Sequence, residues 1–141
     1  MKKIIKWVLL ITWMVVIFMF SSQPAEVSDE KSRLVIQIFN AIGLNLDSVL
    51  GELANFVVRK AAHFTEYFIL ALLVFNVIGE EFKLKQALLL SIVVVFLYAC
   101  SDEFHQIFVP GREGKLRDVL IDTSGGAVAM GVVYIRKQIK N

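Results

Sequence analysis

The sequence predicts an all-α integral membrane protein, a bundle of four transmembrane helices with an amphipathic interfacial helix in its first outer loop. Of the 141 residues, 57% are hydrophobic and only 20% are charged. The mean hydropathy of +0.66 is well above that of soluble domains. Four apolar runs are long enough, or nearly so, to cross a hydrocarbon core of about 30 Å, and a fifth segment repeats apolar residues at helical spacing.

The four apolar runs cover residues 4–20, about 57–78, 84–100 and 119–135. Only Lys6 interrupts the first run, and a lysine near the end of a span can reach the headgroups. This run is longer than the about 7–15 apolar residues of a secretory signal and no A-x-A-like cleavage site follows it, so we expect a retained helix. An apolar face without proline leads into the second run, which predicts a helix from about Ser48 to Ile78. Residues 1–141 are expected to form a single domain.

The first outer loop is predicted to hold an amphipathic helix at about residues 29–42. Ser28 resembles an N-cap, and Gly43 ends the pattern. Leu34 and Ile38 are among the apolar residues that recur at helical spacing between them. A helix of this kind lies in the plane of the membrane interface.

Four crossings place both termini on one side of the membrane, and the charges indicate the cytoplasmic side. Under this topology eight Lys and Arg residues lie inside and seven outside. The pair Lys2-Lys3 and the basic tail at residues 136–140 directly flank the first and last spans, where the positive-inside rule applies most strongly. We therefore expect a multi-pass protein of the cell membrane with both termini cytoplasmic.

With this threading, three polar segments that are far apart in the sequence meet at the outer boundary. They are residues 59–67 (RKAAHFTEY), 101–106 (SDEFHQ) and 112–122 (REGKLRDVLID). Ionisable side chains at a bilayer boundary cost about 2.5 kcal/mol or more each on insertion scales, so they are more often functional than incidental. The convergence predicts a polar pocket on the outer face.

The expected binding residues of this pocket are ionisable or polar side chains of the three segments: Arg59, Lys60, His63, Glu66, Tyr67, Asp102, Glu103, Gln106, Arg112, Arg117, Asp118 and Asp122. Within the first segment, helical spacing places Arg59, His63 and Glu66 on one face. His105 is expected to point elsewhere. The small residues between Ser124 and Gly131 are expected to let another helix approach closely.

Three of these stretches carry a resemblance to a known family. RKAAHFTEYFILALL, SDEFHQIFVPGREGKLRDVLID and the FSSQP at the end of the first helix resemble the VanZ-like family of small membrane proteins, whose namesake is associated with resistance to the glycopeptide teicoplanin. The resemblance runs from about Trp13 to Tyr134. It marks each of the twelve side chains above except Arg117, and family members commonly have Asn at the position of Asp122.

Two functions could use such a pocket. The first is recognition of a phosphate-bearing or glycan-bearing envelope component, or of an antibiotic bound there, with the arginines as bidentate donors. The resemblance then implies a contribution to teicoplanin resistance. The second is a membrane-embedded hydrolase or transferase acting on a lipid-linked or phosphate-bearing substrate. Its candidate catalytic residues, which would hold a divalent metal or supply general acid and base, are His63, Glu66, Asp102 and Asp118.

A structural explanation also remains open at this stage, because buried charges must pair. Arg59 with Asp118 or Asp122, or His63 with Asp102, could lock the helices together. No cofactor is predicted, and the sequence leaves metal binding undecided. The expected partners are the lipid bilayer, a lipid-linked envelope precursor or glycopeptide, and a second copy of the chain. Nucleic acid is not expected, because the basic residues are split between two faces of a membrane.

Overall fold

The computed structural model confirms the predicted all-helical fold and describes residues 2–140, apart from the side chains of Asp47 and Lys140. The elements are α1 (Lys2–Ser21), α2 (Ala25–Ala41), α3 (Leu46–Leu50), a 3-10 turn (Gly51–Leu53), α4 (Ala54–Ile78), α5 (Leu84–Gln106) and α6 (Leu116–Lys140). Within the described residues, four helical stretches are long and apolar enough to cross a membrane: Lys2–Ser21, Ser48–Ile78, Leu84–Gln106 and Leu116–Ile139. The four-span prediction is therefore confirmed.

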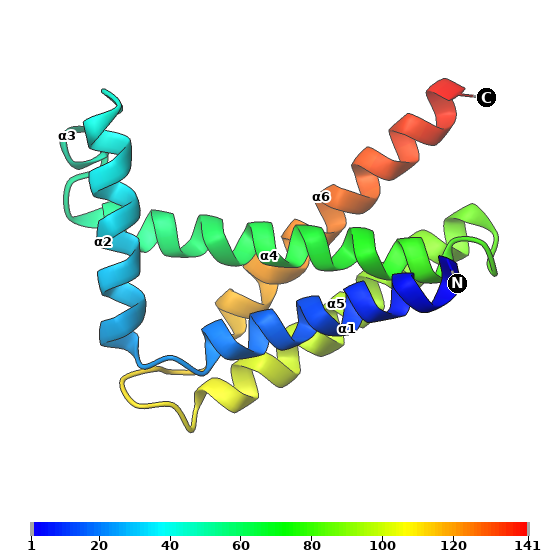
Figure 1. Cartoon of the computed structure of the whole chain (residues 1–141), viewed down its shortest axis with the longest axis horizontal. Helices are drawn as coiled ribbons and strands as arrows, with labels where there is room; N and C mark the ends of the chain where they lie inside the picture. The colour runs from blue at the N-terminus through cyan, green and yellow to red at the C-terminus, as the bar shows by residue number, and fades with distance from the viewer. Residues whose placement is uncertain (1, 141) are drawn as a thin grey trace.

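The helix of the first outer loop starts earlier than the sequence pattern predicts. It begins at Ala25, whose N–H donates a hydrogen bond to the Pro110 carbonyl at 3.3 Å. A first-turn amide that finds a tertiary acceptor needs no side-chain cap. Ser28 consequently lies inside the helix, where its N–H bonds the Pro24 carbonyl, and it is not the cap. The helix stands across the end of α4 (Figure 1).

The helical stretch from Ser48 to Ile78 is present but is divided at Gly51. Gly51 has a φ of +53°, a left-handed conformation that glycine adopts without strain. The chain changes there from α3 to the 3-10 turn, and α4 begins at Ala54. The short α3 packs against α2, so this part of the stretch lies with α2 at one end of the bundle.

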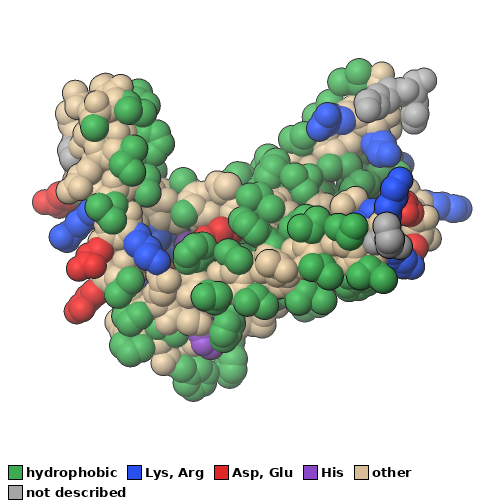
Figure 2. All heavy atoms as spheres, viewed as in Figure 1, with side chains coloured by type: hydrophobic (Ala, Val, Ile, Leu, Met, Phe, Trp, Pro, Cys, Tyr) green, Lys and Arg blue, Asp and Glu red, His purple; other side chains and the backbone are tan. Residues whose placement is uncertain are grey.

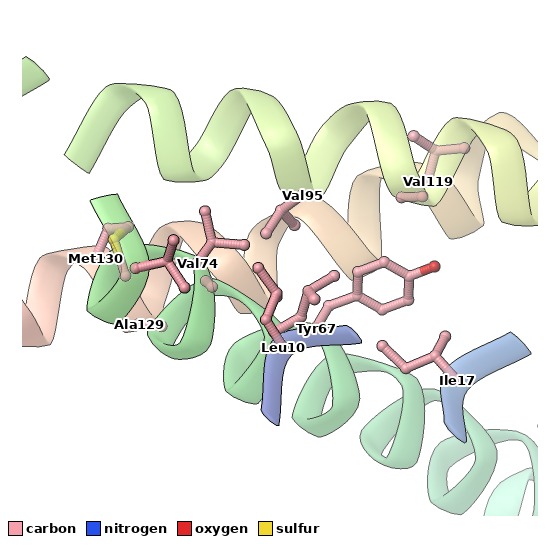
Figure 3. Close-up of a cluster of buried hydrophobic side chains, with 12 residues drawn as sticks. Leu10, Ile17, Tyr67, Val74, Val95, Val119, Ala129 and Met130 are labelled. Atoms are coloured by element: carbon pink, nitrogen blue, oxygen red, sulfur yellow. The ribbon is translucent and has the colours of Figure 1, made fainter. Parts of the chain in front are cut away.

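The hydrophobic core lies between α1, α4, α5 and α6 (Figure 3). Tyr67 of α4 and Val95 of α5 are fully buried in it. Figure 3 shows the Tyr67 hydroxyl pointing away from Val74 and Met130, toward the end of the core where Val119 lies. Large hydrophobic side chains also cover the outside of the helices, and the charged side chains visible in Figure 2 gather at the two ends. This distribution suits a bundle whose solvent is lipid.

Helix α1 is attached to the rest of the bundle along its length. The Trp13 indole donates to the Glu66 carbonyl at 2.9 Å, and the Tyr98 hydroxyl donates to the Met14 carbonyl at 2.6 Å. Two ion pairs join its start to the turn between α4 and α5: Lys3 with Glu81 at 2.6 Å and Lys6 with Glu80 at 2.7 Å. The N-terminus and this turn therefore share one end of the bundle, and the loop between α5 and α6 lies at the other.

Helix α6 approaches α4 and α5 closely through two glycines. A Cβ atom on Gly125 would overlap the Phe64 carbonyl oxygen of α4, and one on Gly126 would lie 2.8 Å from the Val95 side chain of α5. Gly131, two turns further along, faces open space. The predicted packing role of the small residues therefore holds at Gly125 and Gly126 and does not extend to Gly131.

Gly125→Ala should destabilise the protein by about 1–3 kcal/mol, because a backbone oxygen cannot move aside as a flexible side chain can. The control is Gly131→Ala on the same helix, which should be neutral or stabilising by up to about 1 kcal/mol through helix propensity. Thermal unfolding of the purified protein in detergent compares the two. Equal midpoints for both variants would contradict the proposed close contact.

Candidate functional site

Polar side chains from α4, α5 and α6 meet at the end of the bundle opposite the N-terminus. His63 Nδ1 lies 3.7 Å from Asp122 Oδ1. One ligand atom from each of His63, Asp102 and Asp122 lies within 4.8 Å of the other two. The three segments that the sequence separates by many residues thus form one contiguous cluster.

A pocket of about 230 Å³ opens at this end, between the start of α4 and the loop that follows α5. Its cationic side chains are Arg59, Lys60, Arg112, Lys115 and Arg117. Glu113 and Asp118 are the acids of its lining, to which Gln106 and His63 also contribute. We call this the cationic pocket, because cations outnumber acids on its walls.

The strongest ion pair of the pocket joins α4 to α6. Lys60 Nζ lies 2.6 Å from Asp118 Oδ2, and the two side chains are only 13% and 12% exposed. Arg117 Nε lies 3.6 Å from the other Asp118 oxygen, but this arginine is 61% exposed. Both cations also lie over the Phe56 ring, Lys60 at 5.7 Å and Arg117 at 5.1 Å from its centroid. Asp118 therefore contributes to holding the two helices together.

Arg112 fastens the loop after α5 to the end of α1. It donates to the Gln23 carbonyl at 2.7 Å, to the Phe20 carbonyl at 3.4 Å and to the Gln106 side-chain oxygen at 3.3 Å. Burial, together with the nearby Arg59 guanidinium, lowers the pKa of Arg112 from its usual value. An arginine still keeps its proton in proteins, so the pocket retains this positive charge.

Buried acids lie below the cationic pocket. Asp122 is 1% exposed, and neither of its carboxylate oxygens has a hydrogen-bond partner among the described residues. Asp102 accepts one hydrogen bond from Gln106 at 3.2 Å, and its second oxygen is unpartnered within the same residues. Glu103 accepts from the Lys115 backbone N–H at 2.8 Å. We call Asp102, Glu103 and Asp122 the acidic floor. Their carboxylate oxygens have fewer hydrogen-bond and ion-pair partners than the charged side chains that line the cationic pocket.

Two hydroxyl groups are close to the acidic floor. Ser21, at the end of α1, and Tyr67, in the core, interact electrostatically with the Asp102 carboxylate. Neither hydroxyl has a hydrogen-bond partner among the described residues. The floor therefore has polar atoms from α1, α4, α5 and α6 that all face one small region.

An apolar groove of about 250 Å³ runs beside the cationic pocket, between α2 and α4. Val35, Val58 and Ala62 line it, and Glu66 lies on its wall. A further cavity over Val35, Phe39, Ala61 and Thr65 continues it along the outside of α4. The groove and the cationic pocket share three lining residues, which are Arg59, His63 and Arg112.

The ion pairs differ from those that the structural explanation proposed. Arg59 pairs with Asp29 of α2 at 3.1 Å and has no ion pair with Asp118 or Asp122 among the described residues. Lys60 takes the place opposite Asp118. Arg59 pairs with Asp29 because α2 crosses the start of α4 and places Asp29 beside Arg59.

Three of the remaining residues complete the comparison with the sequence. His105 packs its ring against Phe18, with the centroids 4.6 Å apart, and lines neither the pocket nor the groove. Sequence reasoning missed Asp29 and Lys115. Asp29 looked like an ordinary first-turn acid of a helix, and Lys115 contributes its backbone N–H, which no side-chain pattern can reveal.

The comparison with known families agrees with this geometry. The family model described as VanZ/LLP1 matches residues 6–137, which is nearly the whole chain and takes in the polar cluster and most of all four spans. Comparisons with curated proteins and with solved structures gave no match. This chain is a multi-pass membrane protein that belongs to the VanZ/LLP1 family.

Proposed function

We propose that this protein binds a phosphate-bearing envelope lipid at the outer face of the cell membrane. The headgroup would occupy the cationic pocket, and the lipid chain would lie in the apolar groove. One observation carries the proposal: the pocket and the groove have opposite character, yet they share Arg59, His63 and Arg112. An amphiphile with an anionic head fits two such cavities joined at a cationic edge.

The arginines of the cationic pocket have N–H donors that contacts within the protein do not use, and these can bind a phosphate group. The Arg59 side chain is 31% exposed and its contact with Asp29 uses only part of a guanidinium that carries five N–H donors. Arg117 is 61% exposed, and its contact with Asp118 is long, at 3.6 Å. Planar arginine forks bind phosphate oxygens in pairs, and hydrogen bonds of this kind are roughly twice as strong as neutral ones.

The groove suits a hydrocarbon chain. Its accessible surface is mostly apolar, although charged side chains such as Lys31 and Glu66 also line it, and the neighbouring α2 residues Leu34 and Ile38 are exposed. Each buried methylene contributes about 0.8 kcal/mol, so a chain of a few carbons adds as much as a charged hydrogen bond. A water-soluble phosphate would use the pocket alone and would bind more weakly.

In the proposed orientation both termini are cytoplasmic, and the pocket faces the outside of the cell. The basic residues that flank the first and last spans support this orientation. Binding of an envelope lipid on this side would change what a glycopeptide antibiotic meets at the membrane surface. We therefore propose that the protein contributes to teicoplanin resistance, in line with the association of the family's namesake.

A membrane-embedded hydrolase or transferase is the second candidate function. It is favoured by His63, whose Nδ1 has no hydrogen-bond partner among the described residues and lies 3.7 Å from Asp122. A histidine beside a carboxylate at the edge of a phosphate pocket is suited to general acid–base work. Release of inorganic phosphate from a bound lipid would identify this function, and binding without turnover would exclude it.

Arg59→Gln should weaken binding of dioleoyl phosphatidic acid about tenfold or more, since it removes a charged donor of the shared edge. Native mass spectrometry of the purified protein, titrated with the lipid, counts the bound molecules. Arg33→Gln is the matched control, because Arg33 makes the same change of charge at an exposed site of α2 outside both cavities. If both variants lost the same amount of lipid binding, the effect would come from the overall charge of the protein, and a specific site at Arg59 would be contradicted.

Ala62→Phe should fill the apolar groove while leaving the cationic pocket open. Phosphatidic acid binding should fall, whereas binding of inorganic pyrophosphate, measured by calorimetry, should stay unchanged. Ala127→Phe, a change of the same size at an exposed position of α6 away from both cavities, is the control. If Ala62→Phe leaves lipid binding intact, the chain does not lie in the groove and that half of the proposal fails.

Overexpression of the protein in its host should raise the teicoplanin concentration that inhibits growth, and deletion should lower it. The Arg59→Gln variant should give a smaller rise at equal membrane abundance, because it weakens headgroup binding. Arg33→Gln should behave as the unaltered protein. Broth dilution, with immunoblots for abundance, measures this. An unchanged inhibitory concentration on both deletion and overexpression would remove the resistance role.

A further inference from the structure

The acidic floor contains a group of side chains whose geometry goes beyond headgroup binding. His63 of α4, Asp102 of α5 and Asp122 of α6 each direct one ligand atom into a region where all three atoms lie within 4.8 Å. Within residues 2–140, leaving out the side chains of Asp47 and Lys140, no other three His, Cys, Asp or Glu side chains have ligand atoms this close together. Three different helices therefore supply one atom each to the same point.

The second observation is that these atoms lack partners. Asp122 is 99% buried, since its exposed fraction is 1%, and both of its oxygens are unpartnered within the described residues. One Asp102 oxygen and His63 Nδ1 are unpartnered in the same sense. A buried carboxylate without a hydrogen bond or counter-charge is strongly unfavourable, so it either takes a proton or binds a cation.

The cations of the protein do not meet this need. Lys60 is held by Asp118 at 2.6 Å, and Arg112 is directed at two backbone carbonyls and Gln106. The charged groups that act most strongly on Asp122 are three carboxylates and one ammonium, Glu103, Asp102, Asp118 and Lys60, and the His63 imidazole lies 3.7 Å from it. His63 additionally lies near Arg59 and Arg112. An excess of negative charge therefore remains around Asp122 itself.

The donor set selects the kind of ion. One imidazole nitrogen and two carboxylate oxygens match the preferences of Zn²⁺ or Mn²⁺ better than those of Ca²⁺ or Mg²⁺, which favour oxygen alone. Ligand bonds of about 2.0–2.2 Å place tetrahedral ligand atoms about 3.4 Å apart, so the three atoms, which lie within 4.8 Å of one another, would draw together on binding by up to about 1.4 Å. Three protein ligands also leave coordination positions open for water or a phosphate oxygen.

We propose that His63, Asp102 and Asp122 form a binding site for one divalent transition-metal ion, Zn²⁺ or Mn²⁺, at the floor of the cationic pocket. His63 lines both the pocket and the groove, so the open positions of the ion face the headgroup space. Metal binding itself is independent of any lipid. The further step, in which the ion contacts the phosphate, rests on the proposed function.

The test is titration of Zn²⁺ and of Mn²⁺ alone into EDTA-stripped protein in detergent, followed by calorimetry and by thermal unfolding. The unaltered protein should bind one ion per chain and unfold at a higher temperature with the ion present. His63→Ala and Asp122→Asn should each weaken binding at least about tenfold. The controls are His105→Ala, which changes the ring that packs on Phe18, and Glu52→Gln, which changes an exposed acid outside both cavities. Both should bind the ion as the unaltered protein does.

Asp122→Asn also separates metal binding from a structural role. Without metal this variant should be as stable as the unaltered protein or more so, because it removes an unpaired buried charge. With metal it should gain no stability. Absence of saturable binding by the unaltered protein, or binding that both site variants retain, would overturn the proposal. Phosphatidic acid binding measured in EDTA tests the lipid proposal separately, so the two can fail independently.

Discussion

The close packing of α6 on α4 brings together the polar groups that these two helices contribute to the site. Gly125 lets α6 approach the Phe64 carbonyl, and from that contact the two helices run together toward their N-termini. His63 then lies beside Asp122, and Lys60 beside Asp118. The helices α4 and α6 run in the same direction because they are the second and fourth of four crossings. The glycine contact thus fixes the distances on which the ion pairs depend.

The fold and the meeting of the polar segments could be predicted because both follow from repeating features of the sequence. Apolar length gives the spans, and the parity of the crossings brings residues 59–67, 101–106 and 112–122 to one end. The partners could not be predicted in the same way. Arg59 pairs with Asp29 only because α2 lies across α4, and that placement rests on tertiary contacts such as the hydrogen bond from the Ala25 amide to Pro110. Such tertiary contacts leave no periodic signal.

The site is layered by charge. Lysine and arginine side chains form its rim, where water and headgroups can solvate them, and carboxylates form its floor, where the helices exclude water. This order is the reverse of what solvation alone would favour for the acids, since a charge inside the bundle is costly. Only contact with the rim cations, a proton or an added cation can offset that cost. Lys60 does so for Asp118 at 2.6 Å, whereas the nearest ionisable partner of Asp122 is His63, at 3.7 Å and without a hydrogen bond.

The two helix-to-helix contacts of the cluster therefore differ in how closely their charges are paired. If the polar residues served only to lock the helices, each buried charge would end opposite a partner, as Lys60 and Asp118 do. Asp122 and His63 instead face each other at 3.7 Å, and both keep atoms without a hydrogen bond at the base of the cationic pocket. A protein keeps uncompensated groups in such a place at a cost to its stability. The cost is understandable when an outside ligand or ion supplies the missing partner, and Asp122 is the residue at which that requirement is greatest.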